Sequence, residues 1–357
     1  MQKSLRKLLL FLGAVVLGLA LLTGGVFAIL KATKAFHTGD LTGAAEQFSI
    51  INREIPPLPV RDSGNFVILQ FTDTHLVSTK GRDARTLAAM EEQVMSVNPD
   101  LVVVTGGMLD GPNGKLVVDK RGALCAVADI FERHGQYWAY VPGNSDGEVL
   151  GSSADVAAFL GQSYPHCLLS NVEDIAGATQ YVVPVVNDGG ETVHALVFMD
   201  SLGRDPETNF LTYDCIKKSQ ADWLRAQLQA LKSEAPLARA SVFFHANTPA
   251  FTAAQNKGEP YAKSEALYAM LDFPGSWDIR GNEIVDRAIA AAGSVGLVSI
   301  GHLHPAANAC AFLDGTYYHI TRASGYQVTS KPGAAVITIH TYDGSPRRLY
   351  DFEEVVF

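Results

Sequence analysis

Close cysteine pairs are missing from the sequence. The four cysteines are spread along the chain, at Cys125, Cys167, Cys215 and Cys310. Structural zinc sites use cysteines a few positions apart, so this spacing excludes a zinc knuckle. We expect buried thiols that pack as small apolar side chains, although an exported chain would also permit disulfides.

Positive charge is also scarce. The 357 residues include 28 Lys and Arg against 37 Asp and Glu, a formal net charge of −9. Residues 1–31 hold four basic and no acidic residues, so the remainder carries −9 less four positive charges, or −13. Nucleic-acid binding needs a basic face, which excludes nucleic acid as a partner. A phosphorylated small molecule stays open as a partner, because a local metal site can override the overall charge.

Charged residues are absent from one long apolar run near the N-terminus. Residues 8–30 give 23 uncharged positions, and a helix needs about 20 to cross a bilayer. Three basic residues precede the run, which favours a cytoplasmic N-terminus at residues 1–7. We expect a single-pass signal anchor in the cell membrane, with the rest of the chain outside the cytoplasm. The alternative is a signal peptide cleaved after Ala28, which would leave a secreted protein.

After the anchor, residues 31–64 read as a tether with a stiff Pro-rich stretch, and residues 65–357 as one α/β domain. Apolar runs typical of strands alternate with helical patterns in this domain. The expected strands are 66–71, 101–104, 137–141, 193–199, 240–244, 296–300, 336–339 and 349–356, and the expected helices are 82–97, 121–134 and 220–231.

Five of the expected strands run into Gly, Asp, Asn or His. The motifs are Asp73-Thr74-His75, Gly106-Gly107, Gly143-Asn144-Ser145-Asp146, His245 and Gly301-His302-Leu303-His304. Open α/β sheets bind ligands outside the carboxyl ends of their strands. Carboxylate, imidazole and amide oxygen are ligands for divalent metals, so these strand ends predict one convergent metal site.

In order and spacing, the motifs resemble the calcineurin-like metallophosphoesterases. The stretches 198–201, 213–223 and 322–326 are similar to a purple-acid-phosphatase-related branch of that family. The resemblance implies a sandwich of two mixed β-sheets flanked by helices, following the transmembrane helix. It also implies phosphate-ester hydrolysis with divalent ions of the Fe, Mn or Zn type. It assigns one metal to Asp73, His75 and His304, and a second metal to Asn144, His245 and His302.

Two positions depart from the family pattern. Gly107 stands where the family has the metal-bridging Asp, and Ser145 stands where it has the His that assists the leaving group. Without the bridge we expect one ion or fewer, and Ser145 leaves no intact catalytic residue at its position. Restoring Asp at position 107 is expected to raise metal occupancy. We expect Asp110 to cap the segment that follows it, and Asp146 to orient the Asn144 loop.

Two functions are therefore open. The first is a membrane-anchored phosphoesterase whose activity is weak, depends on a single metal, or is lost. The second is a non-catalytic pseudoenzyme that binds a ligand or a protein partner on the same fold.

Overall fold

The fold is seen in a computed structural model, which describes residues 41–111, 119–148, 150–203, 214–261, 282–341, 345 and 347–357. The anchor expected at residues 8–30 lies outside these ranges, as do residues 1–7. Among the helices within them, none combines the length and the apolar character needed to cross a membrane.

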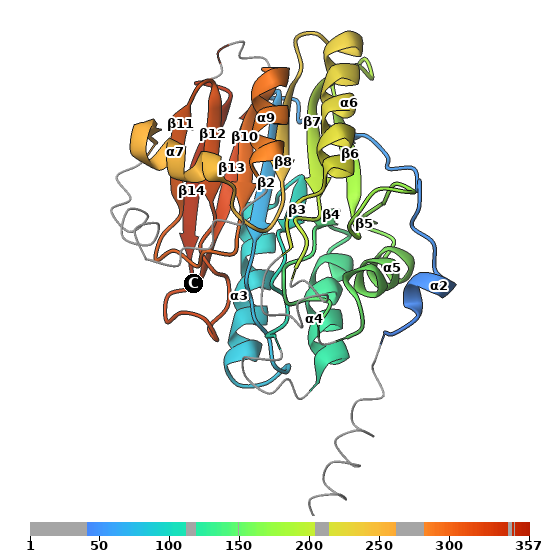
Figure 1. Cartoon of the computed structure of the whole chain (residues 1–357). Coiled ribbons are helices and arrows are strands. Elements are labelled where there is room, and N and C mark those ends of the chain that lie inside the picture. The colour runs from blue at the N-terminus through green and yellow to red at the C-terminus, as the bar shows by residue number, and fades with distance from the viewer. Residues whose placement is uncertain are drawn as a thin grey trace, which may run out of the picture. The chain divides into compact units, whose positions relative to one another are not determined.

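Two mixed β-sheets form the centre of the described part of the chain, and helices flank them (Figure 1). One sheet has six strands in the order β14-β13-β2-β3-β4-β5, and the other has eight in the order β1-β6-β7-β8-β10-β12-β11-β9. Each sheet combines parallel central pairs with antiparallel pairs. The predicted α/β sandwich of two mixed sheets is confirmed.

The six-stranded sheet carries the first three motifs. Its strands are β2 (Asn65–Phe71), β3 (Leu101–Val104), β4 (Trp138–Tyr140), β5 (Cys167–Leu168), β13 (Gly333–His340) and β14 (Tyr350–Val356). The accompanying helices are α3 (Arg82–Val97), α4 (Lys120–Arg133) and α5 (Ser153–Ser163). Because β2, β3 and β4 pair in parallel, the loops that follow them lie at one edge of the sheet.

The eight-stranded sheet carries the other two motifs. Its strands are β1 (Leu58–Pro59), β6 (Gln180–Val186), β7 (Thr192–Met199), β8 (Arg239–Phe243), β9 (Glu259–Pro260), β10 (Val295–Ile300), β11 (Ala309–Leu313) and β12 (Thr316–Ile320). Its helices are α6 (Lys218–Glu234), α7 (Pro249–Lys257) and α9 (Glu283–Ala292). Strands β8 and β10 are parallel neighbours, so the loops after them also share one edge.

Alternate residues of β7 belong to two hydrophobic layers. Leu196 and Phe198 pack in the layer between the sheets. Val197 and Met199 pack with Leu224 of α6 in a second layer, on the outer face. The side-chain period of two in a strand thus explains why an unbroken apolar run is needed here, since both faces are covered.

A polar contact joins the sheets across this core. Ser299 of β10 donates from Oγ to Oε1 of Gln70 in β2, at 2.6 Å, and lies 2.9 Å from Nδ1 of His319 in β12. The His319 ring stacks on Phe352 of β14, with centroids 5.2 Å apart. Burial lowers the pKa of His319 to about 3, so this imidazole is neutral inside the sandwich.

Residues 41–64, expected within the tether, pack on the domain. The short helix α2 (Ala44–Gln47) contacts α5, and β1 pairs in parallel with β6. Leu41, Leu58 and Val60 are buried in the core. Pro59 has no N–H to donate, and it lies in the edge strand, where proline is tolerated. The compact unit therefore starts at Leu41.

Candidate metal centre

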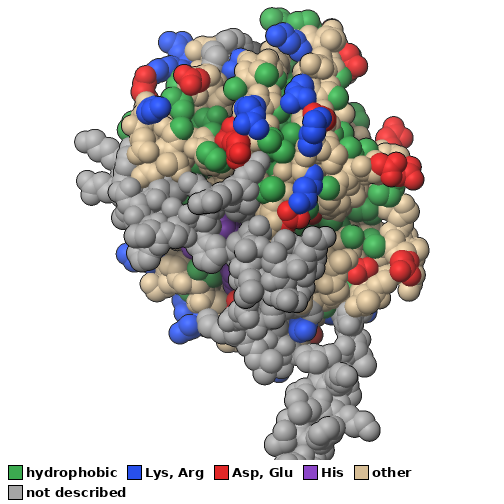
Figure 2. Space-filling model, in the orientation of Figure 1, with side chains coloured by type: hydrophobic (Ala, Val, Ile, Leu, Met, Phe, Trp, Pro, Cys, Tyr) green, Lys and Arg blue, Asp and Glu red, His purple; other side chains and the backbone are tan. Residues whose placement is uncertain are grey.

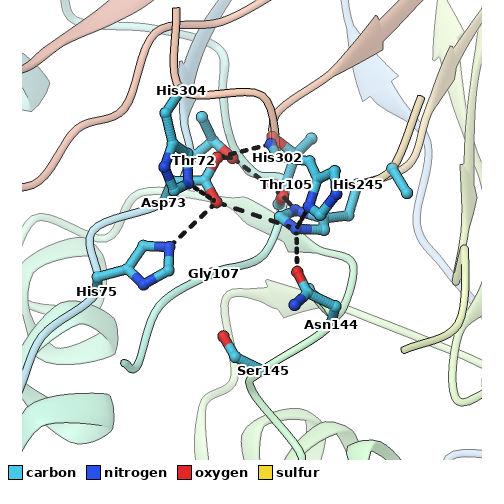
Figure 3. Close-up of polar contacts among 12 residues, drawn as sticks. Thr72, Asp73, His75, Thr105, Gly107, Asn144, Ser145, His245, His302 and His304 are labelled. Atoms are coloured by element: carbon cyan, nitrogen blue, oxygen red, sulfur yellow. Dashed lines mark hydrogen bonds and ion pairs between the residues drawn. The ribbon is translucent and has the colours of Figure 1, made fainter. Parts of the chain in front are cut away.

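The predicted site residues meet where the loops of the two sheets converge (Figure 3). Asp73 and His75 follow β2, Gly107 follows β3 and Asn144 follows β4. From the other sheet, His245 follows β8, and His302 and His304 follow β10. Both sheets therefore contribute residues to the site.

Four of the candidate ligands have left-handed backbone conformations. Their φ angles are 51° at Asp73, 45° at His75, 67° at His302 and 47° at His304. Side chains with a Cβ avoid this region, and such residues gather at functional sites, where the surrounding structure holds them. Backbone hydrogen bonds supply that support: the N–H groups of Asp73 and His75 donate to the carbonyls of Gly106 and Gly107, each at 2.9 Å.

Asp73 is held by one of its carboxylate oxygens. Its side chain is 1% exposed, and Oδ2 accepts hydrogen bonds from Oγ1 of Thr72 and from the backbone N–H of His302, both at 2.8 Å. These two contacts fix the direction in which the other oxygen, Oδ1, points.

Oδ1 of Asp73 faces three imidazole nitrogens. The distances to Nε2 are 3.1 Å for His304, 3.5 Å for His75 and 3.9 Å for His245. Burial acts to raise the pKa of Asp73, but the charges of His304 and His245 hold it well below its usual value. The carboxylate is therefore an anion at the centre of the site.

His75 has a second carboxylate behind it. Its Nδ1 lies 3.3 Å from Oδ1 of Asp110. Burial acts to lower the pKa of His75, but Asp110 and Asp73 outweigh it and raise the pKa to about 9. The sequence predicts a cap by Asp110 for the segment after it, but residues 112–118 lie outside the described ranges, and no sequence pattern signals the contact with His75. A carboxylate on the far nitrogen orients a metal-binding imidazole.

The second part of the site is a buried imidazole cluster. His245 is fully buried, and its Nδ1 lies 2.7 Å from the carbonyl of Thr105, which can only accept. In neutral His245 the Nε2 therefore carries a lone pair, 2.9 Å from Oδ1 of Asn144 and 3.2 Å from Nδ1 of His302. Burial, with His245 adding to it, lowers the pKa of His302 to about 3.

This donor set fits a divalent cation. Asp73, His75 and His304 offer ligand atoms that all lie within 4.8 Å of one another. A tetrahedral ion with bonds of about 2.0–2.1 Å separates its ligands by about 3.3 Å. The distances of 3.1 Å and 3.5 Å from Oδ1 of Asp73 to the two imidazoles bracket that value.

One part of the site opens to solvent. The side chains of His304 and His75 are 32% and 20% exposed, whereas His245 has no exposure. Histidine side chains are visible on the face drawn in Figure 2. A small ligand can therefore approach the ion position beside His75 and His304.

Gly107 and Ser145 are both in close contact with their surroundings. A Cβ built on Gly107, whose φ is 68°, would lie 2.4 Å from Oδ1 and 3.0 Å from Cα of Asp73. Ser145 is buried, and its Oγ donates to the carbonyl of Leu109 at 3.0 Å. The proton of the Ser145 hydroxyl is thus used in a hydrogen bond to the backbone.

Asp146 organises the loops after β3 and β4. Its carboxylate accepts from the N–H groups of Gly107 at 3.0 Å, Leu109 at 3.2 Å and Gly143 at 2.9 Å. The Tyr140 hydroxyl donates to it at 3.0 Å. The prediction that Asp146 orients the Asn144 loop is confirmed.

A distant loop supports the Asp73 loop from behind. The Ser324 N–H donates to the carbonyl of Thr72 at 2.8 Å, and the Thr72 N–H donates to Ser324 Oγ at 3.1 Å. Gly325 packs so closely that a Cβ there would lie 2.0 Å from the carbonyl oxygen of Thr74. Residues 322–326 thus support the Asp73 loop. Their similarity to the purple-acid-phosphatase-related branch did not by itself indicate this role.

The sandwich, the strand-end loops and the carboxylate–imidazole cluster together define a protein of the metallophosphoesterase class. Residues 66–306 match the model of the calcineurin-like phosphoesterase family, so the chain belongs to that family. The family implies divalent metal and phosphoester substrates.

Two known proteins are similar to this chain. The chain is 30% identical over 199 residues to "Probable inactive purple acid phosphatase 28" of Arabidopsis thaliana, a match that covers 47% of this chain and 49% of the relative. The chain thus spans about half the length of that relative. A dimetal phosphatase from Danio rerio aligns with a TM-score of 0.50 and 13% identity, over 82% of this chain and 99% of the other. At that identity the likeness shows the fold alone.

Proposed function

We propose that the chain is a metal-dependent phosphoester hydrolase of reduced activity that works with a single divalent ion. The observation that supports this most is the convergence of Asp73, His75 and His304, with the last two partly exposed to solvent. Three protein ligands and an open position are the usual composition of a catalytic zinc-type site.

The chain's own groups prepare the site for this chemistry. When bound, the ion would polarise a phosphoryl oxygen and lower the pKa of a bound water. Asp110 orients His75, and the carbonyl of Thr105 keeps the acceptor nitrogen of His245 turned inward. Ser145 offers no acid for the leaving group, because its Oγ donates to Leu109. Hydrolysis then depends on a leaving group that needs no proton.

Charge favours one ion over two. Two divalent ions about 3.5 Å apart repel by about 19 kcal/mol at an effective dielectric near 20, and a bridging carboxylate offsets much of this in dinuclear sites. Among the six candidate ligands, Asp73 is the single carboxylate, whereas Asn144 and the four histidines are neutral when they bind metal. One negative charge is too little to offset the repulsion between two ions.

The test is turnover of an aryl phosphate by the full chain in detergent, with Mn²⁺, Zn²⁺ or Fe²⁺ added in turn. We expect slow hydrolysis with at least one metal, and loss of it in Asp73→Asn. A chain that holds an ion and yet hydrolyses no aryl phosphate or phosphodiester would point to the second candidate.

That second candidate is a binding pseudoenzyme on the same fold. Gly107 and Ser145 favour it, and the name of the matched relative includes the word "inactive". Such a protein would keep affinity for inorganic phosphate at the ion without turnover. Phosphate binding measured by calorimetry, beside the turnover assay, separates the two functions.

We further propose that the domain lies outside the cytoplasm and that residues 8–30 anchor it in the membrane. The uncharged run and the basic residues before it support this orientation. Protease added to intact spheroplasts should digest the domain. Protection until lysis would contradict the orientation, and a mature N-terminus after Ala28 would indicate cleavage and secretion instead.

A further inference from the structure

The space beside Gly107 is filled by Asp73. A Cβ at position 107 would come within 2.4 Å of Oδ1 and within 3.0 Å of Cα of Asp73. The carboxylate cannot easily move aside, because Thr72 and the N–H of His302 hold its other oxygen at 2.8 Å. Residue 107 and Asp73 therefore compete for one position.

That position lies between the two parts of the site. Oδ1 of Asp73 is 3.1 Å from Nε2 of His304 in one part and 3.9 Å from Nε2 of His245 in the other (Figure 3). Oδ1 also lies 3.5 Å from Nε2 of His75, so this one carboxylate oxygen is within reach of ligands from both sheets.

We propose that the Asp73 carboxylate occupies the position between the two parts of the site. We also propose that glycine at position 107 is required for the carboxylate to stay there. The chain then binds one ion at Asp73, His75 and His304, an inference that rests on the metal dependence of the proposed function. Gly107 is on this view a part of the working site, and not the trace of a lost ligand.

For Gly107→Asp, the expected effect on metal binding is then the opposite of the one predicted from the sequence. Asp at position 107 was expected to raise metal occupancy by standing between two metals. In the structure its Cβ would displace the Asp73 carboxylate, and the φ of 68° disfavours any residue with a Cβ. Gly107→Asp is therefore expected to weaken the ion site without creating a second one.

The experiment measures Zn²⁺ stoichiometry and affinity of the full chain in detergent. We expect one Zn²⁺ in the wild type, an affinity at least tenfold lower in Gly107→Ala, and no second Zn²⁺ in Gly107→Asp. The tenfold figure is the low end of the loss seen when groups that position ligands are changed. Asp73→Asn, which keeps the side-chain shape, should abolish binding.

Gly293→Ala is the matched control. Gly293 has a φ of 62°, and a Cβ there meets nothing within 4 Å, so the variant carries the backbone strain without the clash. Its Zn²⁺ affinity should equal that of the wild type, and thermal unfolding without metal monitors the fold of every variant.

Three results would overturn the inference alone: two retained Zn²⁺ ions in Gly107→Asp, unchanged affinity in Gly107→Ala, or a bound Zn²⁺ in Asp73→Asn. A wild-type chain that binds no Zn²⁺, Mn²⁺ or Fe²⁺ would overturn the proposed function and this inference together. The two failures are therefore distinguishable.

Discussion

Asp110 acts on the site through His75. Its carboxylate lies 3.3 Å from Nδ1, on the side of the ring away from Asp73. We expect Asp110→Asn to lower divalent-metal affinity by about 10–100-fold, because the imidazole loses its orienting charge. Calorimetric titration with Zn²⁺ measures this. Unchanged affinity would mean that the backbone alone positions His75.

Ser145 at the position of the family's His bears on which substrates are hydrolysed. A general acid contributes about 10²–10⁴-fold to such reactions, and Ser145 supplies none. Rates over a series of aryl phosphates should therefore fall steeply as the pKa of the leaving phenol rises, and alkyl phosphates should be hydrolysed slowest. A flat dependence would reveal another proton donor in the site.

At the scale of residues, the sequence motifs were enough to predict which candidate ligands lie close together. Asp73, His75, Asn144, His245, His302 and His304 do lie together. The supporting residues were missed, because their partners are remote in the chain. Ser324 and Thr72 are 252 positions apart, and no local pattern signals such a contact.

At the scale of elements, three helices with one apolar face were predicted, whereas α9, which also buries one face, was not. The helix expected at 82–97 is α3, with the same ends. Helix α5 was missed, because it is buried over most of its surface and gives no amphipathic pattern. Strand β6 was missed as well: Pro184 interrupts its apolar run, and pairing with β7 restores the strand.

Buried His319, in the contact between the sheets, makes the free energy of unfolding depend on pH. His319 has its pKa lowered to about 3 from an ordinary 6.5, so between these values the unfolded chain binds a proton that the native protein does not. The contribution of neutral His319 to the stability of the native protein is present above pH 6.5 and is lost as the pH falls. The contribution to the slope is about 1.4 kcal/mol per pH unit.

We expect His319→Gln to reduce the pH slope of the unfolding free energy by that amount between pH 6 and 4. The control is Ser299→Ala, which removes a hydrogen bond of the same network without a titrating group. It should lower stability at every pH and keep the slope. Equal slopes in wild type and His319→Gln would show that His319 takes up its proton in the native state too.

At the scale of the whole molecule, an ion would join the two sheets. Asp73 and His75 follow a strand of one sheet, and His304 follows a strand of the other. Zn²⁺ at 100 times its dissociation constant should therefore raise the unfolding free energy by about 2.7 kcal/mol. Denaturant melts with and without Zn²⁺ measure this, and Asp73→Asn should show no gain.

The left-handed backbone at four candidate ligands has a consequence for kinetics. Each such conformation costs about 1–3 kcal/mol. These conformations form when the chain folds, before any ion binds. Capture then needs no loop rearrangement. Its rate should follow the water-exchange rates of the aquo ions and be first order in metal up to high concentration, as in a rigid chelator.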